Sequence, residues 1–240
     1  MGGTGHSSKD AEEAAFQWIR LTGFGREVSC RRRERKDIRK VRALRHFYKN
    51  CFIPALEQTV FQENRYYHIH QEQLIELFLS AFRQLCNRLY ARQQEGRIGA
   101  ISIIEYSLQA SPSTVELFGY RVEAYGEQGY EDAEPYSENY NIAWLYQFVP
   151  ELMTNLNEQR KAYGGKILGG DIENMMRGEL VLFHQFAAQL IRSAIPRAIS
   201  EPQYAALAKT DSFNIRLGRE GKQRKTIYIK HDAFDFGGQG

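Results

Sequence analysis

The chain has 240 residues, of which 42% are hydrophobic and 25% charged. This composition is that of an ordinary globular protein with enough apolar residues for a sizeable core. No run approaches eighteen consecutive apolar residues, which excludes a transmembrane helix on length. The cysteines Cys30, Cys51 and Cys86 are odd in number and form no C-x-x-C pair, which argues against a disulfide framework and against a zinc knuckle.

The N-terminal stretch Met1–Asp10 is rich in glycine and serine and lacks the apolar core of a secretory signal peptide. We therefore expect a flexible tail over residues 1–10, followed by a single globular domain over residues 11–240 and a cytoplasmic location. A sub-boundary near residue 97, where the sequence pattern changes, is the alternative domain organisation.

The first hundred residues predict a helical bundle. Apolar side chains recur there at three- and four-residue steps, which places them on one face of each helix. Pro54 is expected to end the helix that precedes it, and Gly96 to end the last one. The expected helices are Ala11–Leu21, a basic helix that begins near Arg31 and runs to Phe52, Ala55–Glu63 and Gln71–Gln94.

Two alternating, β-branched segments follow, Ile98–Leu108 and Val115–Tyr125, and together they predict a central β-hairpin. A short buried helix is the alternative for the first of them. The next stretch, Glu127–Tyr140, carries five acidic residues and no basic one, and we expect an exposed loop.

The rest of the chain predicts further helices and a C-terminal hairpin. Asp171–Ile195 is expected to be one helix, because its apolar residues keep strict four- and three-residue spacing up to Pro196. The other expected elements are a helix from Asn141 to Tyr163 closed by Gly164-Gly165, a short helix capped by Ser200, and strands Ser212–Leu217 and Thr226–Lys230. The predicted fold class is therefore α+β and predominantly helical.

Charge is strongly segregated along the chain. The segment Arg31–Lys49 holds ten basic residues against Glu34 and Asp37, a net charge of +8, and the segment Arg216–His231 adds a further +5. The whole chain carries only +3, which leaves −10 on the remainder. Such separation indicates an oriented electrostatic surface, although a charge run is also a common feature of a solvated helix face.

In the first basic segment, the residues Ile38, Val41, Leu44 and Tyr48 are expected to form the packing stripe of the helix. On another face a cationic line is then available to an anionic partner. This line consists of Arg35, Arg39, Arg42, His46 and Lys49.

No catalytic or metal-binding motif stands out. His68 and His70 lack two further ligands at suitable spacing, so we expect helix-entry polar residues and no metal site. His184 is expected to be a half-buried, hydrogen-bonded histidine. The glycine-rich stretch Gly164–Gly170 could offer backbone N–H groups to an anion, but it is no P-loop and a plain interhelix connection is the favoured interpretation. We expect no cofactor and favour a non-enzymatic function, while an active site assembled from distant positions stays open.

One enzymatic alternative depends on a resemblance. Arg39 and His46, with six residues between them, resemble the Arg-x4–6-His pattern of the helical HEPN ribonucleases, in which both side chains act on the scissile phosphate. The resemblance covers two residues, and Lys40 differs from the polar neighbour usual in that pattern. It implies a nuclease in which His46 is essential.

The leading expectation is a nucleic-acid-binding protein that contacts phosphates with little sequence preference. The expected contact residues are Arg35, Arg39, Arg42, Lys49, Arg219, Lys222, Arg224 and Lys225. The alternative is a protein-protein interaction or assembly module, in an oligomer or with an acidic partner, whose basic helix docks an acidic surface. The segment Glu127–Tyr140 is acidic enough to be an internal partner of that helix. Neither hypothesis involves a membrane.

Overall fold

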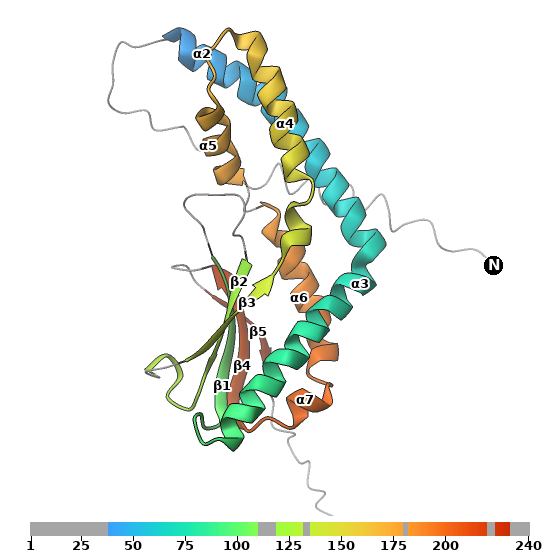
Figure 1. Ribbon diagram of the computed structural model, residues 1–240, viewed down its shortest axis with the longest axis vertical. Coiled ribbons are helices and arrows are strands. Elements are labelled where there is room, and N and C mark those ends of the chain that lie inside the picture. Colours follow the sequence, from blue (N-terminus) through green and yellow to red (C-terminus); the bar gives the residue numbers. More distant parts are fainter. Residues whose placement is uncertain (1–37, 110–118, 132–134, 180–181, 220–223, 231–240) are drawn as a thin grey trace, which may run out of the picture. The chain divides into compact units, whose positions relative to one another are not determined.

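The computed structural model describes residues 38–109, 119–131, 135–179, 182–219 and 224–230 (Figure 1). The chain divides into two compact units. The first contains the chain up to Gln62 together with Glu151–Asn174, and the second contains Glu63–Pro150 and the chain from Met175 onward. The expected tail Met1–Asp10 and the expected helix Ala11–Leu21 lie outside the described residues.

The structure confirms a mixed α+β fold with a long helix near the N-terminus, but not the predicted division of that region into separate helices. Helix α2 (Ile38–Phe47) runs through a π-turn, η1 (Tyr48–Phe52), directly into the 42-residue helix α3 (Ile53–Gln94). The described residues of this region therefore form one continuous helix and no bundle.

The prediction that Pro54 ends the helix is wrong, and the π-turn accounts for it. A proline ring lacks an N–H donor and clashes with the carbonyl four residues before it in a regular helix. In η1 the hydrogen bonds span five residues, as in the bond from the Ile53 N–H to the Tyr48 carbonyl. This wider turn relieves the clash, because the carbonyl groups before the proline are displaced.

Helix α3 ends where the sequence predicts, at Gly96. The Gly96 N–H donates to the Gln93 carbonyl and the Arg97 N–H to the Arg92 carbonyl, and Gly96 has a positive φ of 68°. Glycine suits this left-handed conformation because it has no Cβ. The Gln93 amide then bonds the backbone of Gly99 and Ala208, which ties the helix end to the chain entering two strands.

The second unit contains a five-stranded sheet of order β3-β2-β1-β4-β5. The strands are β1 (Ile101–Leu108), β2 (Gly119–Tyr125), β3 (Tyr136–Asn141), β4 (Lys209–Arg219) and β5 (Lys225–Ile229). Strands β1 and β4 are parallel and every other neighbouring pair is antiparallel. The predicted pairing of Ile98–Leu108 with Val115–Tyr125 is confirmed as the β1-β2 pair, and Ser212–Leu217 pairs with Thr226–Lys230 as part of the same sheet.

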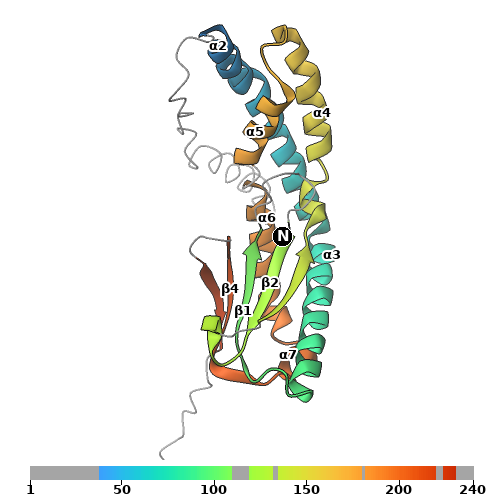
Figure 2. The same ribbon diagram turned by 60° about the vertical axis from the view of Figure 1, so that its left-hand side comes forward.

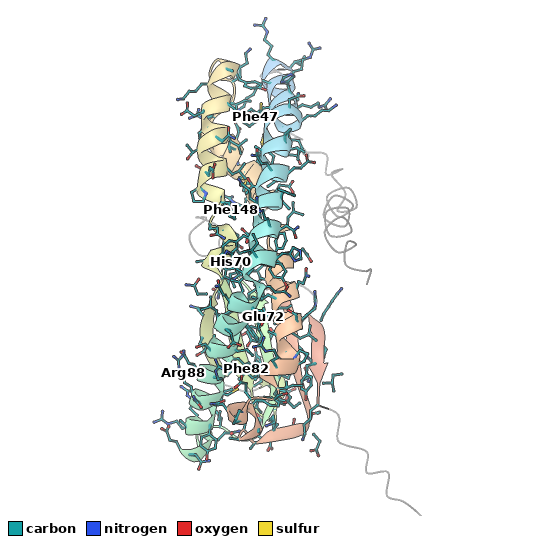
Figure 3. All side chains as sticks on the ribbon, turned by 90° about the vertical axis from the view of Figure 1, so that its right-hand side faces the viewer. Phe47, His70, Glu72, Phe82, Arg88 and Phe148 are labelled. Carbon is teal, nitrogen blue, oxygen red and sulfur yellow. The ribbon has the colours of Figure 1, made fainter. Side chains whose placement is uncertain are left out.

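One face of the sheet packs against helices. Figure 1 shows the C-terminal part of α3, helix α6 (His184–Ala198) and helix α7 (Pro202–Ala205) along this face. Phe78 of α3 meets the rings of Tyr106 and Tyr140. Phe82, which Figure 3 labels on α3, meets the ring of Tyr204. Burial of each phenylalanine side chain stabilises this core by about 2–3 kcal/mol.

The expectation of an exposed loop over Glu127–Tyr140 is wrong for its second half. Residues 136–141 form the edge strand β3, in which Tyr136 and Tyr140 are buried while Ser137 and Asn139 are exposed. An edge strand has only one neighbour, so its polar side chains can remain in water and its sequence lacks the β-branched residues that mark a central strand.

The first unit contains most of helix α4 (Val149–Gln159), the 3-10 turn η5 (Arg160–Tyr163) and most of helix α5 (Gly169–Glu179). Pro150 lies in the first turn of α4, where a proline costs no helical hydrogen bond. Gly164 and Gly165 end η5 with φ angles of 57° and 75°, which confirms the predicted stop. Figure 2 shows the course of these elements from a second direction.

The single helix predicted over Asp171–Ile195 is wrong, because α5 ends at Glu179 and α6 begins at His184. Gly178 has a low helix propensity and precedes the break. Pro196 also fails to stop α6, which continues to Ala198. Ser200 is no N-cap, since its hydroxyl bonds the Pro196 carbonyl and α7 begins after Glu201. The predicted apolar residues from Met176 to Ala194 are nevertheless buried wherever the structure describes them.

Candidate functional site

Helix α2 exposes a group of basic side chains, which we call the cationic surface of α2. It consists of Arg39, Arg42, Arg45 and, one turn later in η1, Lys49. All four side chains are exposed, and the described part of α2 contains no acidic residue. Within the described part of the chain none of the four forms an ion pair. Of the predicted contact residues, Arg35 lies outside the described residues.

The packing face of α2 differs from the predicted stripe. Ile38 is 77% exposed and Val41 51%, whereas Phe47 is fully buried. The ring of Phe47 meets the edge of the Tyr163 ring at a centroid distance of 5.3 Å. A phenylalanine buries more apolar area than a valine, so Phe47 determines which side of the helix packs. Two aliphatic side chains therefore lie exposed beside the cations.

The remaining cation of α2, Lys40, has a partner inside the first unit. Its Nζ lies 3.3 Å from Oδ2 of Asp171, and the same oxygen accepts a hydrogen bond of 2.8 Å from the Leu168 N–H. Asp171 thus caps the start of α5 from its third position. The stretch Gly164–Gly170 therefore serves as the connection into this capped helix.

His46 is oriented by the end of η5. Its Nδ1 lies 2.9 Å from the hydroxyl of Tyr163, and Sγ of Cys51 lies 3.3 Å from the same hydroxyl. Desolvation by burial and the hydrogen bond with Cys51 raise the pKa of Tyr163 to about 12, which keeps the phenol protonated. Arg39 and His46, the pair of the nuclease hypothesis, are both exposed on α2.

The C-terminal basic residues divide into different environments. Lys225 is exposed at the start of β5, while Lys222 and the side chain of Arg219 lie outside the described part of the structure. Arg224 is half-buried and forms an ion pair with Glu105, so this predicted phosphate contact already has an internal partner. The described residues of this cluster belong to the second unit and the cationic surface of α2 to the first.

The acidic segment Glu127–Tyr140 also finds its partners within the second unit. Oε2 of Glu138 accepts hydrogen bonds from Arg88 at 2.5 Å and from the hydroxyl of Tyr136 at 2.7 Å. Figure 3 shows Arg88 on α3. The described contacts of this segment therefore involve α3 and the sheet, and they do not support its role as an internal cover for the basic helix.

Sequence reasoning missed a polar cluster on the sheet face opposite the helices, which we call the outer face. Its centre is Glu105 of β1, which is fully buried and accepts hydrogen bonds from Ser107 at 2.7 Å and from Tyr130 at 2.5 Å. Arg216 of β4 donates to the Tyr130 hydroxyl at 3.0 Å. A glutamate within a β-branched strand is the one sequence signal that could have indicated this cluster, because an unpaired buried carboxylate would be costly.

A second buried carboxyl group, Glu63 of α3, is also missed by sequence patterns. It is fully buried and its carboxyl oxygens have no hydrogen-bond partner among the described residues. Desolvation raises its pKa to about 8. Nearby in the second unit, the hydroxyl of Tyr146 lies 3.1 Å from Nε2 of His184. The predicted hydrogen bond of this histidine is confirmed, but the side chain is buried and not half-buried.

The histidines of α3 are placed as ordinary helix residues. Nδ1 of His70 lies 2.9 Å from the side-chain oxygen of Gln73, and its ring packs on Tyr66. Among the described residues there is no group of three or more His, Cys, Asp or Glu side chains that could hold a metal ion. The described helices likewise include none with the length and apolar character needed to cross a bilayer.

Comparison with protein-family models, with curated proteins and with solved structures gave no match. The function is therefore inferred from the geometry of these surfaces.

Proposed function

We propose that the protein binds nucleic acid through phosphate contacts made by the cationic surface of α2. The observation that carries the proposal is that Arg39, Arg42, Arg45 and Lys49 are exposed together on about three turns of helix without an acidic residue among them. Like charges this close repel each other, and an anionic partner relieves that repulsion. Lys222 and Lys225 are proposed as additional contacts.

Arginine and lysine side chains are the usual donors to phosphate oxygens, and such backbone contacts position a protein on nucleic acid without reading its sequence. Each phosphate contact releases condensed counterions, so the logarithm of the affinity falls with the logarithm of salt by about 0.9 per contact on a duplex. Four contacts correspond to a slope of about −3.6.

The test replaces Arg39, Arg42 and Arg45 by Glu in the full chain and measures duplex binding by fluorescence anisotropy at several salt concentrations. We expect binding to be lost at moderate salt while the helical circular dichroism is unchanged. The control replaces Arg65, Arg177 and Arg192 by Glu, which are also exposed and change the net charge by the same amount. Equal loss in both variants, or no loss in the first, would refute a specific role for α2.

The exposure of Ile38 and Val41 favours a second candidate function, the docking of an acidic protein surface. Phosphate backbones offer no apolar partner to these side chains, whereas a protein surface does. The variant Ile38→Ser/Val41→Ser keeps every cation. Under the first proposal it binds duplex normally, and under the second it loses a protein partner or an oligomeric state that the wild type shows in light scattering.

The resemblance to HEPN ribonucleases motivates one further check. A labelled RNA incubated with the protein should remain intact over hours if the function is binding alone. Loss of RNA that a His46→Ala change stops would instead establish a nuclease.

A further inference from the structure

Two arginines converge on one exposed tyrosine at the outer face of the sheet. Arg216 lies on β4 and Arg224 directly precedes β5, and their guanidinium carbons lie 5.5 Å and 5.6 Å from the ring centroid of Tyr130. Tyr130 belongs to the 3-10 turn η3 (Gly129–Glu131) and is 47% exposed. The β4-β5 pair thus meets η3, which is distant in sequence, at one place on the sheet.

Hydrogen bonds hold the guanidinium group of Arg216 in position, and an ion pair holds that of Arg224. Nε of Arg216 donates to Oδ1 of Asn214 at 2.7 Å, and its Nη1 donates to the Tyr130 hydroxyl at 3.0 Å. Nε of Arg224 is paired with Glu105. Gly218 lets Arg224 approach, because a Cβ at this glycine would lie 2.9 Å from the Arg224 Cα. The two side chains are therefore oriented before any ligand arrives.

Among the described residues, the charges at this place do not balance. Glu105 is the one described carboxylate that pairs with either arginine, through Arg224, so two cations face one anion there. The neighbouring carboxylate, Glu123, is held by Nη2 of Arg121 and by the hydroxyl of Tyr125, each at 3.1 Å. Within the described residues, Nη2 of Arg216 and both Nη atoms of Arg224 have no carboxylate partner.

We propose that Arg216 and Arg224 form a phosphate-binding site on the outer face of the sheet. Planar guanidinium groups donate pairs of hydrogen bonds to phosphate oxygens, and a half-buried setting strengthens them. The bound phosphate supplies the missing negative charge. The phosphate belongs either to a small free compound or to the backbone of a single strand laid across the sheet. The site lies in the second unit and does not depend on α2.

The test follows the side-chain Nε–Hε signals of the full chain by NMR during titration with inorganic phosphate. We expect the signals of Arg216 and Arg224 to shift in a saturable manner, and sodium chloride of equal ionic strength to leave them in place. Arg216→Gln should weaken phosphate binding about tenfold or more, because it removes a charge-assisted pair of hydrogen bonds.

The matched control is Arg121→Gln, which removes a cation from the same sheet face but outside the site. It should leave phosphate affinity within about twofold of the wild type, because its guanidinium is already paired with Glu123. Arg216→Gln retains all three partners of Glu105, so it is expected to fold, and Arg216→Lys serves as a second variant that keeps the charge. Absence of saturable shifts in the wild type, or equal weakening by both glutamine variants, would overturn the proposal.

The source of the phosphate is distinguished by competition. If inorganic phosphate or a mononucleotide displaces a labelled single-stranded oligonucleotide and binds equally well, the ligand is a small phosphate compound. Tighter binding of the oligonucleotide that Arg216→Gln abolishes identifies a nucleic-acid backbone. The α2 triple variant should retain Arg216-dependent phosphate binding, so failure of this site and failure of the α2 proposal give different results.

Discussion

Glu63 shows how far burial can change the behaviour of one residue. Its carboxyl group is removed from water, and desolvation raises its pKa to about 8. At pH 7 the group is therefore mostly protonated and neutral. The unfolded chain holds the same side chain at its ordinary value of 4.5. Between pH 4.5 and about pH 8, Glu63 therefore holds a proton in the folded protein but not in the unfolded chain, so folding takes up a proton.

Replacement of Glu63 by Gln is expected to remove this pH dependence. A raised folded-state pKa means that stability is highest below pH 4.5 and falls as the pH rises towards 8, with no further loss above it. The loss is about 1.4 kcal/mol per pH unit inside that window. The measurement is the free energy of urea unfolding for both proteins from pH 5 to pH 9, and the difference should grow in favour of the variant.

The control for this prediction is Glu173→Gln, at an exposed position of α5. It should leave the profile parallel to that of the wild type. Parallel profiles for Glu63→Gln as well would show that Glu63 is ionised in the folded protein.

Neither Glu63 nor Glu105 could be identified from the sequence as a buried carboxyl group. Each is a single acidic residue in an ordinary helix or strand pattern. The partners of Glu105 include Tyr130 and Arg224, which lie 25 and 119 residues away in the chain. A hydrogen bond at His184 was predictable because the residue lies beside an apolar stripe of its own helix, but its partner, Tyr146, comes from another segment. Local pattern therefore identifies some side chains that become buried, and it does not identify the distant residues that surround them.

At the scale of elements, replacement of two glycines by Ala is expected to change the free energy of unfolding in opposite directions. Gly96 has a φ of 68°, a conformation that L side chains rarely adopt, whereas Gly178 lies within α5 and a Cβ there meets no atom within 4 Å. Gly96→Ala should destabilise the protein by about 1 kcal/mol. Gly178→Ala should stabilise it by about 0.5–1 kcal/mol through helix propensity.

Thermal unfolding of the two alanine variants measures the difference directly. A melting temperature that falls for Gly96→Ala and rises for Gly178→Ala agrees with the termination of α3 at Gly96 by backbone geometry. A rise in both would contradict the left-handed turn.

The element boundaries show what sequence patterns can and cannot predict. The sequence correctly predicts helix ends at Gly96 and Gly164, because the turn that ends each helix requires a positive φ, which glycine readily adopts. The helix ends predicted at Pro54 and Pro196 are wrong. The π-turn η1 widens the helix before Pro54, and Pro196 lies in the last turn of α6, which continues past it. The apolar stripe over Asp171–Ile195 correctly predicts which described side chains are buried, but it wrongly predicts one unbroken helix. Two helices on either side of a break can bury the same face. Strand β3 was missed because its side chains fit an exposed edge.

At the scale of the molecule, the sequence showed the segregation of charge but not its distribution between units. The cationic surface of α2 belongs to the first unit, and the Arg216–Arg224 site belongs to the second. The two compact units divide inside α3, between Gln62 and Glu63, and the possible domain boundary near residue 97 stays a prediction. A helix that continues across two units has no interruption in its sequence pattern to indicate the division.

This division leads to a prediction about where ligands protect the chain. A ligand slows amide exchange in the unit that binds it, because exchange from that unit then requires dissociation. Duplex DNA should therefore slow exchange in α2 and η1, and inorganic phosphate should slow it in β4 and β5. Hydrogen exchange followed by mass spectrometry of peptides from both units resolves the two effects. The α2 triple variant should lose the first protection and keep the second. Protection spread equally over both units by either ligand would contradict two separate anion-binding surfaces.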